Sequence, residues 1–246
     1  MKLDILAVAA HPDDVELGCS GTLLMEIKNG KKVGIVDLTQ GELGTRGTIE
    51  TRKAEAEKSA KVMGVSVREN LKMADGFFQN DRNHQLQLVR AIRKYQPEII
   101  LGNALEDRHP DHGRAARLIA DAAFLSGLQK IETKDEQGTM QAAWRPKYVF
   151  HFIQDRYLVP SFVIDITDVF EDKMASIACF ASQFYVNGAE DDDEPQSYIS
   201  TPDFLDSVIA RARMMGKRIG VKYGEGFNTE KSIGFQNFDS LIKVVT

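Results

Sequence analysis

The sequence is poor in cysteine and has no long apolar run. Its 246 residues include only Cys19 and Cys179, far apart and outside any C-x-x-C pattern, which predicts two reduced thiols in a cytoplasmic protein. No apolar run approaches the roughly 18 residues that a membrane span needs. The short apolar run at the start contains Asp4 and leads into a polar motif, so it does not resemble a signal peptide. We therefore expect a cytoplasmic protein without a membrane partner.

Positive charge is also not in excess. Lysine and arginine number 31 against 36 acidic residues, which gives a net charge of −5 and argues against a general nucleic-acid binder. The apolar fraction of 43% and the charged fraction of 27% are typical of a globular protein with a substantial core. The sequence contains no repeat and no linker, so we expect a single domain over residues 1–246.

Segments typical of strands and of helices alternate along the chain. Proline, glycine and the periodicity of apolar residues set the limits of each segment. The expected strands are 3–10, 32–38, 67–73, 98–101, 148–153 and 162–166. The expected helices are 16–29, 48–63, 84–95, 111–128, 168–182 and 202–219. The acidic segment 187–197 is expected to be a solvated loop, with a calcium site or a subunit contact as the minor alternatives.

This alternation predicts an α/β fold with a mostly parallel sheet covered by helices on both faces. Ligands of such folds bind beyond the carboxyl ends of the strands, at the point where the strand order reverses. In the common order 3-2-1-4 that point lies between the first and fourth strands. Strand 3–10 runs into HPDD and strand 98–101 into EDRHPDH, so both motifs would lie over one crevice.

The first motif, HPDD, contains His11, Asp13 and Asp14. One interpretation is helix capping, with Asp13 or Asp14 as the N-cap and Glu16 in the first turn. The other is a metal site, because Zn²⁺ binds imidazole and carboxylate groups and a catalytic site uses three protein ligands. The motif would supply two ligands and leave one carboxylate to accept a proton from the attacking water.

The second motif, HPDH, places His109 and His112 on either side of Pro110 and Asp111. Capping of the following helix by Asp111 is the alternative to a functional role. However, three of the five histidines now lie at two predicted strand ends, which favours a shared site. One of the two histidines would complete the ligand set. The other, with Asp111, would hold a proton or stabilise an oxyanion.

Two other kinds of protein fit these motifs less well. A nucleotide-binding oxidoreductase would need a G-x-G-x-x-G turn after the first strand, and the sequence there is HPDDVELGCSG. A non-catalytic metal-binding or sugar-binding protein would have no use for the additional Asp13 and His109. A catalytic metal site is therefore the favoured interpretation.

At the two motifs the chain resembles the PIG-L/LmbE-like N-acetylglucosamine deacetylases. Segments 37–64 and 209–227 resemble the branch of that family that deacetylates N-acetylglucosaminyl malate in bacillithiol biosynthesis. The resemblance implies a Rossmann-like three-layer sandwich and a zinc-dependent hydrolase. It implies His11, Asp14 and His112 as zinc ligands, Asp13 as the general base, and His109 as a second catalytic residue partnered by Asp111. Fe²⁺ or Co²⁺ would accept the same ligands.

The resemblance also suggests how the substrate, a small acetylated amino-sugar conjugate, is held. Arg52 and Asp75 are similar to residues that hold the sugar in relatives, and the branch carries an arginine at the position of Arg108. Guanidinium groups bind carboxylates in a bidentate manner, so Arg46, Arg52 and Arg108 would suit a dicarboxylate such as malate, unless they are ordinary surface residues. Another N-acetylglucosaminyl conjugate is the alternative substrate.

Three further points rest on the same resemblance. Many members read HPDDE, whereas Val15 follows Asp14 here and the glutamate is Glu16. Some relatives place a tyrosine near the oxyanion, and Tyr185 and Tyr198 are both candidates. Relatives are often homo-oligomeric, and the same is expected here.

Overall fold

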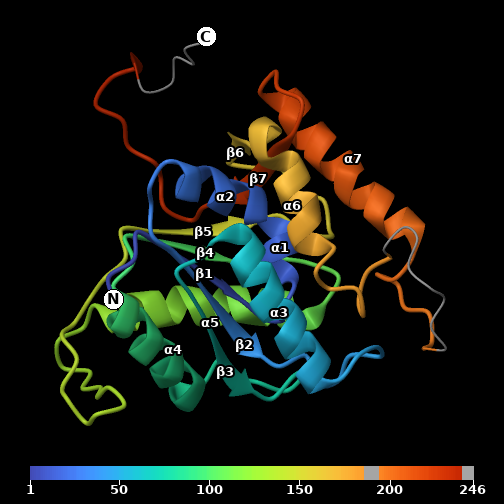
Figure 1. Cartoon of the computed structure of the whole chain (residues 1–246). Helices are drawn as coiled ribbons and strands as arrows, with labels where there is room; N and C mark the ends of the chain where they lie inside the picture. Colours follow the sequence, from blue (N-terminus) through green and yellow to red (C-terminus); the bar gives the residue numbers. More distant parts are fainter. Residues whose placement is uncertain (186–193, 240–246) are drawn as a thin grey trace.

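The computed structural model describes residues 1–185 and 194–239, which form one seven-stranded sheet flanked by helices (Figure 1). The strand order is β3-β2-β1-β4-β5-β7-β6, and β3 through β5 run parallel. This confirms the predicted α/β class and the order expected for the first four strands. The strands are β1 (Ile5–Ala9), β2 (Val33–Thr39), β3 (Val67–Met73), β4 (Ile99–Gly102), β5 (Tyr148–Phe152), β6 (Phe162–Asp165) and β7 (Gly224–Asn228).

Helices cover both faces of the sheet. In Figure 1, α4 and α5 lie on one face and α1, α2, α3, α6 and α7 on the other. The helices are α1 (Asp14–Gly18), α2 (Ser20–Lys28), α3 (Ile49–Met63), α4 (Arg82–Tyr95), α5 (Pro110–Ser126), α6 (Phe170–Ile177) and α7 (Pro202–Arg218), and Thr167–Val169 forms a 3₁₀ turn. None of these helices combines the length and the apolar character of a membrane span.

The central strand β1 explains the continuous apolar pattern at the start of the sequence. Leu6 and Val8 face the core beneath α4 and α5, whereas Ile5, Ala7 and Ala9 face the core on the opposite side. A strand that is buried on both faces needs apolar residues at successive positions rather than at alternate ones.

The strand β7 was not expected from the sequence. Its sequence, GEGFN, lacks the apolar run of a strand, yet it pairs antiparallel with both β5 and β6. The glycines are needed because α7 packs closely against it. A Cβ atom on Gly226 would lie 2.9 Å from Sδ of Met215, and one on Gly224 would lie 2.9 Å from the backbone nitrogen of Gly216, both on α7. The close packing therefore selects glycine and removes the usual strand signal.

Two expected helices are shorter or interrupted. The helix expected over 16–29 is divided at Cys19 into α1 and α2, and the one expected over 168–182 ends at Ile177. Both cysteines are free and buried. Of the acidic segment, residues 187–193 lie outside the described ranges.

A buried ion pair bridges the break between α1 and α2. Nζ of Lys173 donates to the carbonyl oxygens of Glu16 (2.8 Å) and Leu17 (3.1 Å) and to Oε1 of Glu225 (2.8 Å). The carboxylate of Glu225 accepts from the backbone N–H groups of Gly21 (3.0 Å) and Thr22 (2.7 Å). The peptide groups that a helix end leaves unpaired are thus satisfied by two side chains from distant segments.

We expect Lys173→Met to destabilise the fold by about 3–5 kcal/mol, because it leaves the Glu225 carboxylate buried without its cation. Urea unfolding monitored by circular dichroism measures the loss. Lys217→Met, at an exposed position of α7, is the matched control and should change stability little. A loss below about 1 kcal/mol for Lys173→Met would show that the pair does not hold the two helix ends together.

Candidate active site

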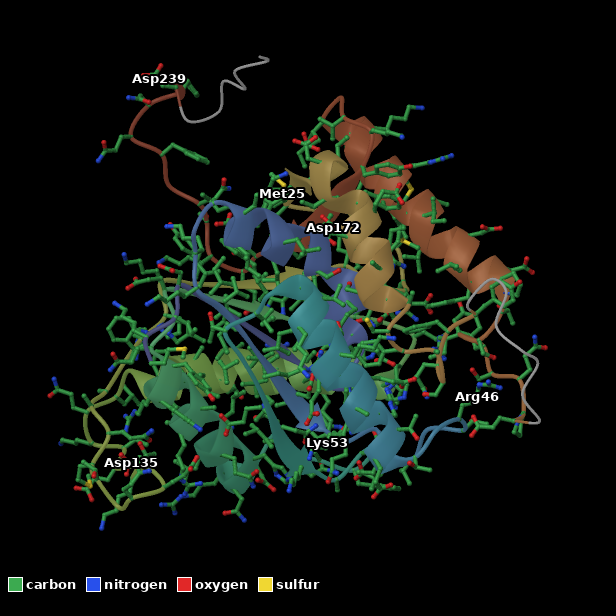
Figure 2. The ribbon with its side chains drawn as sticks, in the orientation of Figure 1. Met25, Arg46, Lys53, Asp135, Asp172 and Asp239 are labelled. Atoms are coloured by element: carbon green, nitrogen blue, oxygen red, sulfur yellow. The ribbon has the colours of Figure 1, made fainter. Side chains whose placement is uncertain are left out.

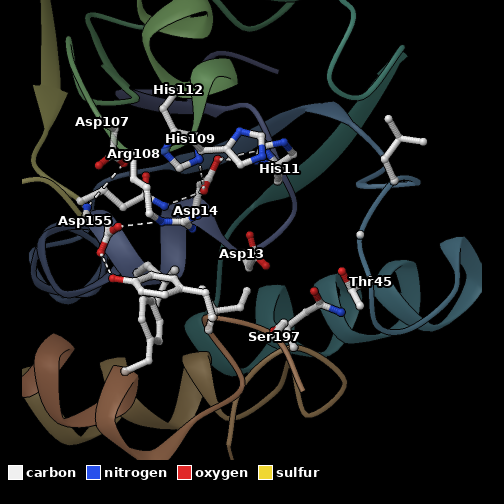
Figure 3. Close-up of a pocket in the computed structure, with 18 of the residues that line it drawn as sticks. His11, Asp13, Asp14, Thr45, Asp107, Arg108, His109, His112, Asp155 and Ser197 are labelled. Carbon is white, nitrogen blue, oxygen red and sulfur yellow. Dashed lines mark hydrogen bonds and ion pairs between the residues drawn. The ribbon is translucent and has the colours of Figure 1, made fainter. Parts of the chain in front are cut away.

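The two sequence motifs meet at one edge of the sheet, because β1 and β4 are parallel neighbours that end side by side. They line a pocket of about 470 Å³. The ring centroids of His11 and His109 are 4.6 Å apart, those of His109 and His112 5.2 Å, and those of His11 and His112 5.5 Å. Figure 3 shows the three imidazoles gathered around Asp14, with Asp13 to one side.

The carboxylate of Asp14 lies between two histidines. Its Oδ2 is 3.4 Å from Nδ1 of His11, and its Oδ1 is 3.0 Å from Nε2 of His112. Amide groups fix its orientation: Nδ2 of Asn103 donates to Oδ2 (3.0 Å) and Nε2 of Gln154 donates to Oδ1 (2.6 Å). Burial raises the pKa of Asp14, but the charge of His112 and the hydrogen bonds from both histidines outweigh it and hold this pKa well below its usual value.

Each of these two histidines uses its second ring nitrogen to contact another carboxylate. Nε2 of His11 is 3.0 Å from Oδ1 of Asp75 and 3.4 Å from Oδ2 of Asp111. Nδ1 of His112 is 2.6 Å from Oδ2 of Asp107. Carboxylates in this position fix the tautomer and the ring orientation of metal-binding histidines.

The donor set fits a divalent metal ion. Tetrahedral ligands at roughly 2.0–2.2 Å from zinc lie about 3.3–3.6 Å from one another, close to the separations of Asp14 from His11 and His112. Candidate ligand atoms of His11, His109 and His112 also lie within 4.8 Å of one another, as do those of His11, Asp75 and Asp111. The described residues therefore contain a His/Asp cluster that could hold a metal.

Asp13 lies beside this cluster and is paired with Arg52. Nη2 of Arg52 is 2.8 Å from Oδ2 of Asp13, and Nη1 donates to the carbonyl oxygen of Gly41 (3.2 Å). Burial raises the pKa of Asp13 to about 6, although Arg52 partly opposes the change. Asp13 is the N-cap residue of α1, as the capping interpretation expected, but its side chain makes no capping hydrogen bond and is left to face Arg52.

His109, rather than Asp111, is the N-cap of α5. Its Nδ1 accepts from the backbone N–H of Asp111 at 3.3 Å, so the neutral ring carries its proton on Nε2. Burial lowers the pKa of His109, and the neighbouring His11 and His112 lower it further. The Asp111 carboxylate contacts His11 and accepts from the backbone N–H of Gly76 (2.8 Å) and from Arg114 (2.5 Å). Asp111 thus contacts His109 through its backbone.

The four residues proposed from the sequence to hold the substrate all line the pocket. Arg52 is paired with Asp13, and Asp75 contacts His11, as described above. Nε of Arg108 donates to Oδ2 of Asp155 (2.9 Å), and its guanidinium lies 4.2 Å from the centre of the Tyr198 ring. Nε of Arg46, which is labelled near one edge of the molecule in Figure 2, donates to the carbonyl oxygen of Ser182 (2.9 Å).

Of the two candidate tyrosines, Tyr198 lines the pocket and donates to Oδ1 of Asp155 at 3.1 Å. Tyr185 is not among the residues that line it. Glu16, which departs from the usual spacing, is fully buried and accepts from Nη1 of Arg68 (2.7 Å) and from Ser59 (2.6 Å). It joins α1 to Arg68 on β3, on the side of the helix away from the pocket, and does not line the pocket.

Sequence reasoning missed several residues of the site, among them Asn103, Asp107, Gln154 and Arg211. A signal existed for the first three. Asn103 and Gln154 lie within two residues of the carboxyl ends of β4 and β5, where ligand-binding residues gather in such sheets. Asp107 is the acidic residue that precedes the HPDH motif. For Arg211, in the middle of α7, the sequence offers no comparable signal.

Comparison with known proteins identifies the family. The model of the PIG-L family, described as GlcNAc-PI de-N-acetylase, matches residues 6–123, which include both motifs. Diacetylchitobiose deacetylase of Thermococcus kodakarensis is 28% identical over 190 residues, which cover 73% of this chain and 70% of the relative. The 4-oxalmesaconate hydratase of Pseudomonas putida is 26% identical over 193 residues, 72% of this chain and 73% of the relative.

Solved structures agree with this result. The conserved protein TT1542 from Thermus thermophilus is 33% identical, with a TM-score of 0.83 over 95% of this chain and 97% of that one. The N,N'-diacetylchitobiose deacetylase from Pyrococcus horikoshii, complexed with its inhibitor MPG, is 25% identical, with a TM-score of 0.77 over 97% of this chain and 88% of that one. The chain belongs to the PIG-L family of deacetylases, which confirms the family and the enzyme class predicted from the motifs.

We expect His112→Ala to bind zinc at least ~10²-fold more weakly, because removal even of a group that merely orients a metal ligand costs 10–100-fold. Zinc content after dialysis, measured by mass spectrometry, tests this. His84→Ala on α4, outside the pocket, is the control and should bind as the wild type does. Stoichiometric zinc in the His112→Ala protein would show that His112 is not a ligand.

Proposed function

We propose that this protein is a zinc-dependent deacetylase that converts N-acetylglucosaminyl malate to glucosaminyl malate and acetate, a step of bacillithiol biosynthesis in the cytoplasm. The observation that carries the proposal is Asp13, a buried carboxylate held by Arg52 beside a His/Asp cluster suited to a metal. The resemblance of segments 37–64 and 209–227 to the malate-specific branch supports the choice of substrate.

His11, Asp14 and His112 would hold the ion, with Fe²⁺ or Co²⁺ as acceptable substitutes for Zn²⁺. When bound, zinc supplies a Lewis acid that polarises the acetamide and lowers the pKa of water to about 7. Asp75 and Asp107 would orient the rings of His11 and His112 through their second nitrogens.

The reaction then needs one group that accepts a proton and one that donates it. Asp13 accepts the proton of the water that attacks the acetamide carbon, and Arg52 holds the carboxylate in place. The C–N bond breaks, acetate is released, and the amine takes up a proton. Nε2–H of His109 or the protonated Asp13 supplies that proton. Both lie at the pocket, and His109 can also stabilise the oxyanion.

The sugar and its aglycone would occupy the remainder of the pocket. Arg108 is half-exposed, with 49% of its side chain accessible, and would reach a carboxylate of malate. A different N-acetylglucosaminyl conjugate remains the alternative substrate. One relative is named as a hydratase, an enzyme that adds water to its substrate and releases no acetate. The assay must therefore measure acetate, which only a deacetylase releases.

We expect Asp13→Asn to retain zinc but to lose at least ~10²-fold in kcat, because the general base is lost while the ligands remain. Zinc content and acetate release, both measured on the same preparation, separate the two roles. Asp206→Asn, an exposed change on α7, controls for the loss of one carboxylate from the chain. Wild-type activity in Asp13→Asn would rule out this carboxylate as the base.

The substrate is tested by acetate release from N-acetylglucosaminyl malate and from N-acetylglucosamine, with zinc-loaded and with chelated protein. Fast, chelator-sensitive release from the conjugate is the expected result. Arg108→Ala should raise KM about 10-fold or more for the conjugate and far less for the free sugar, because only the conjugate carries carboxylates. Equal effects on both substrates would remove Arg108 from substrate recognition.

A further inference from the structure

The arginines that were expected to bind a substrate carboxylate are largely engaged by the protein itself. Arg52 neutralises Asp13, and Arg46 donates to the carbonyl oxygens of Ser182, Glu194 and Pro195. Arg108 is bonded to Asp155 (Figure 3), and its guanidinium is stacked on the ring of Tyr198. An incoming anion would have to displace these partners from Arg46 and Arg52. Of the three arginines, only Arg108 has a side chain exposed enough to bind an anion while it keeps its present partners.

Arg211 differs from these three. It lies on α7, lines the same pocket, and is half-buried. In residues 1–185 and 194–239 its one hydrogen bond runs from Nη2 to the carbonyl oxygen of Leu17, at 3.4 Å. Typical N–H···O distances are 2.9–3.0 Å, and the same carbonyl already accepts from Lys173 at 3.1 Å. The guanidinium therefore has most of its five donors available.

No described side chain completes its hydrogen bonds. Arg211 shares the pocket wall with Leu17, Ile199 and Phe204. The carboxylates of Asp155 and Asp107 lie near enough to favour its charge, but no described residue forms an ion pair with it. Burial lowers its pKa, although a guanidinium stays charged at neutral pH. A cation that is half-buried and poorly paired costs free energy unless a ligand completes its hydrogen bonds.

The position of Arg211 relative to the reacting group is also suitable. Leu17, whose carbonyl it contacts, is one helical turn from Asp13, since the N–H of Leu17 donates to the carbonyl oxygen of Asp13 at 3.0 Å. One turn advances about 5.4 Å. In a glycoside of N-acetylglucosamine, the aglycone is attached to C1, next to the C2 that bears the acetamide. A substrate whose acetamide reaches Asp13 must therefore place its aglycone nearby.

We propose that Arg211 is a specificity-determining residue that binds a carboxylate of the substrate's aglycone, with Arg108 on the exposed side of the same subsite. This inference rests on the proposed deacetylase function and adds a residue outside both motifs. The fork of the guanidinium binds one carboxylate through two N–H groups. The protein thus accepts a dianionic aglycone despite its acidic net charge of −5.

The test compares N-acetylglucosaminyl malate with methyl N-acetylglucosaminide, a neutral glycoside of the same sugar, for wild type, Arg211→Met, Arg211→Lys and Arg213→Met. For Arg211→Met we expect the ratio of kcat/KM between conjugate and neutral glycoside to fall about 10- to 100-fold, as the loss of charge-assisted hydrogen bonds predicts. Arg211→Lys keeps the charge but not the fork and should lose part of this preference. Arg213→Met, exposed and outside the pocket, should keep all of it.

The outcomes separate the two proposals. A wild type that releases no acetate from the conjugate would overturn the proposed function and the subsite with it. A wild type that prefers the conjugate, together with Arg211 variants that keep this preference, would overturn the subsite alone. Equal losses of kcat/KM on both substrates would show that Arg211 only supports α1 through its contact with Leu17 and does not bind the aglycone. If Arg211→Met fails to fold, Arg211→Lys and the KM for the conjugate decide the question.

Discussion

The buried negative charge of Asp14 organises the edge of the sheet where β1, β4 and β5 end. A carboxylate that loses its water costs several kcal/mol unless other groups replace its hydrogen bonds. Here the replacements come from several segments: the backbone N–H of His11, the amides of Asn103 and Gln154, and the imidazoles of His11 and His112. These segments follow β1, β4 and β5, so the ends of three neighbouring strands are held together by one charge.

The hydrogen-bond network continues outward from Asp14 through the two histidines. The two histidines that contact Asp14 require carboxylates on their other nitrogens, which Asp75 and Asp107 supply. Asp107 in turn accepts from the backbone N–H of Arg156 at 2.6 Å, which ties it to the loop after β5. Each group is therefore fixed by the next, and the arrangement leaves little freedom to the side chains of His11, Asp14 and His112. Such preorganisation is what metal binding and proton transfer both need.

Behind α1, a second set of buried charges holds the helix itself. Glu16 is paired with Arg68, whose Nε and Nη2 also bind the Asp37 carboxylate at 2.8 and 2.9 Å. Lys173 and Glu225 join the end of α1 to the start of α2. The glutamate at position 16 thus has a structural role that explains its burial. The pocket side of this segment carries Asp13, Asp14 and Leu17, and the carbonyl oxygen of Leu17 accepts from Arg211.

The sequence by itself determined the strands β1 to β6, the order of the first four, and the meeting of the HPDD and HPDH motifs. These follow from local periodicity and from the rule that parallel strands end at one edge. Only the tertiary structure decided which side chains contact one another. Asp75 approaches His11 across 64 positions, Asn103 reaches Asp14 across 89, and Arg211 reaches Leu17 across 194. Periodicity indicates which face of an element is buried, but such partners depend on how distant elements pack. For the same reason β7 was missed. Its glycines are required by the close approach of α7, and glycine has no local preference for strand.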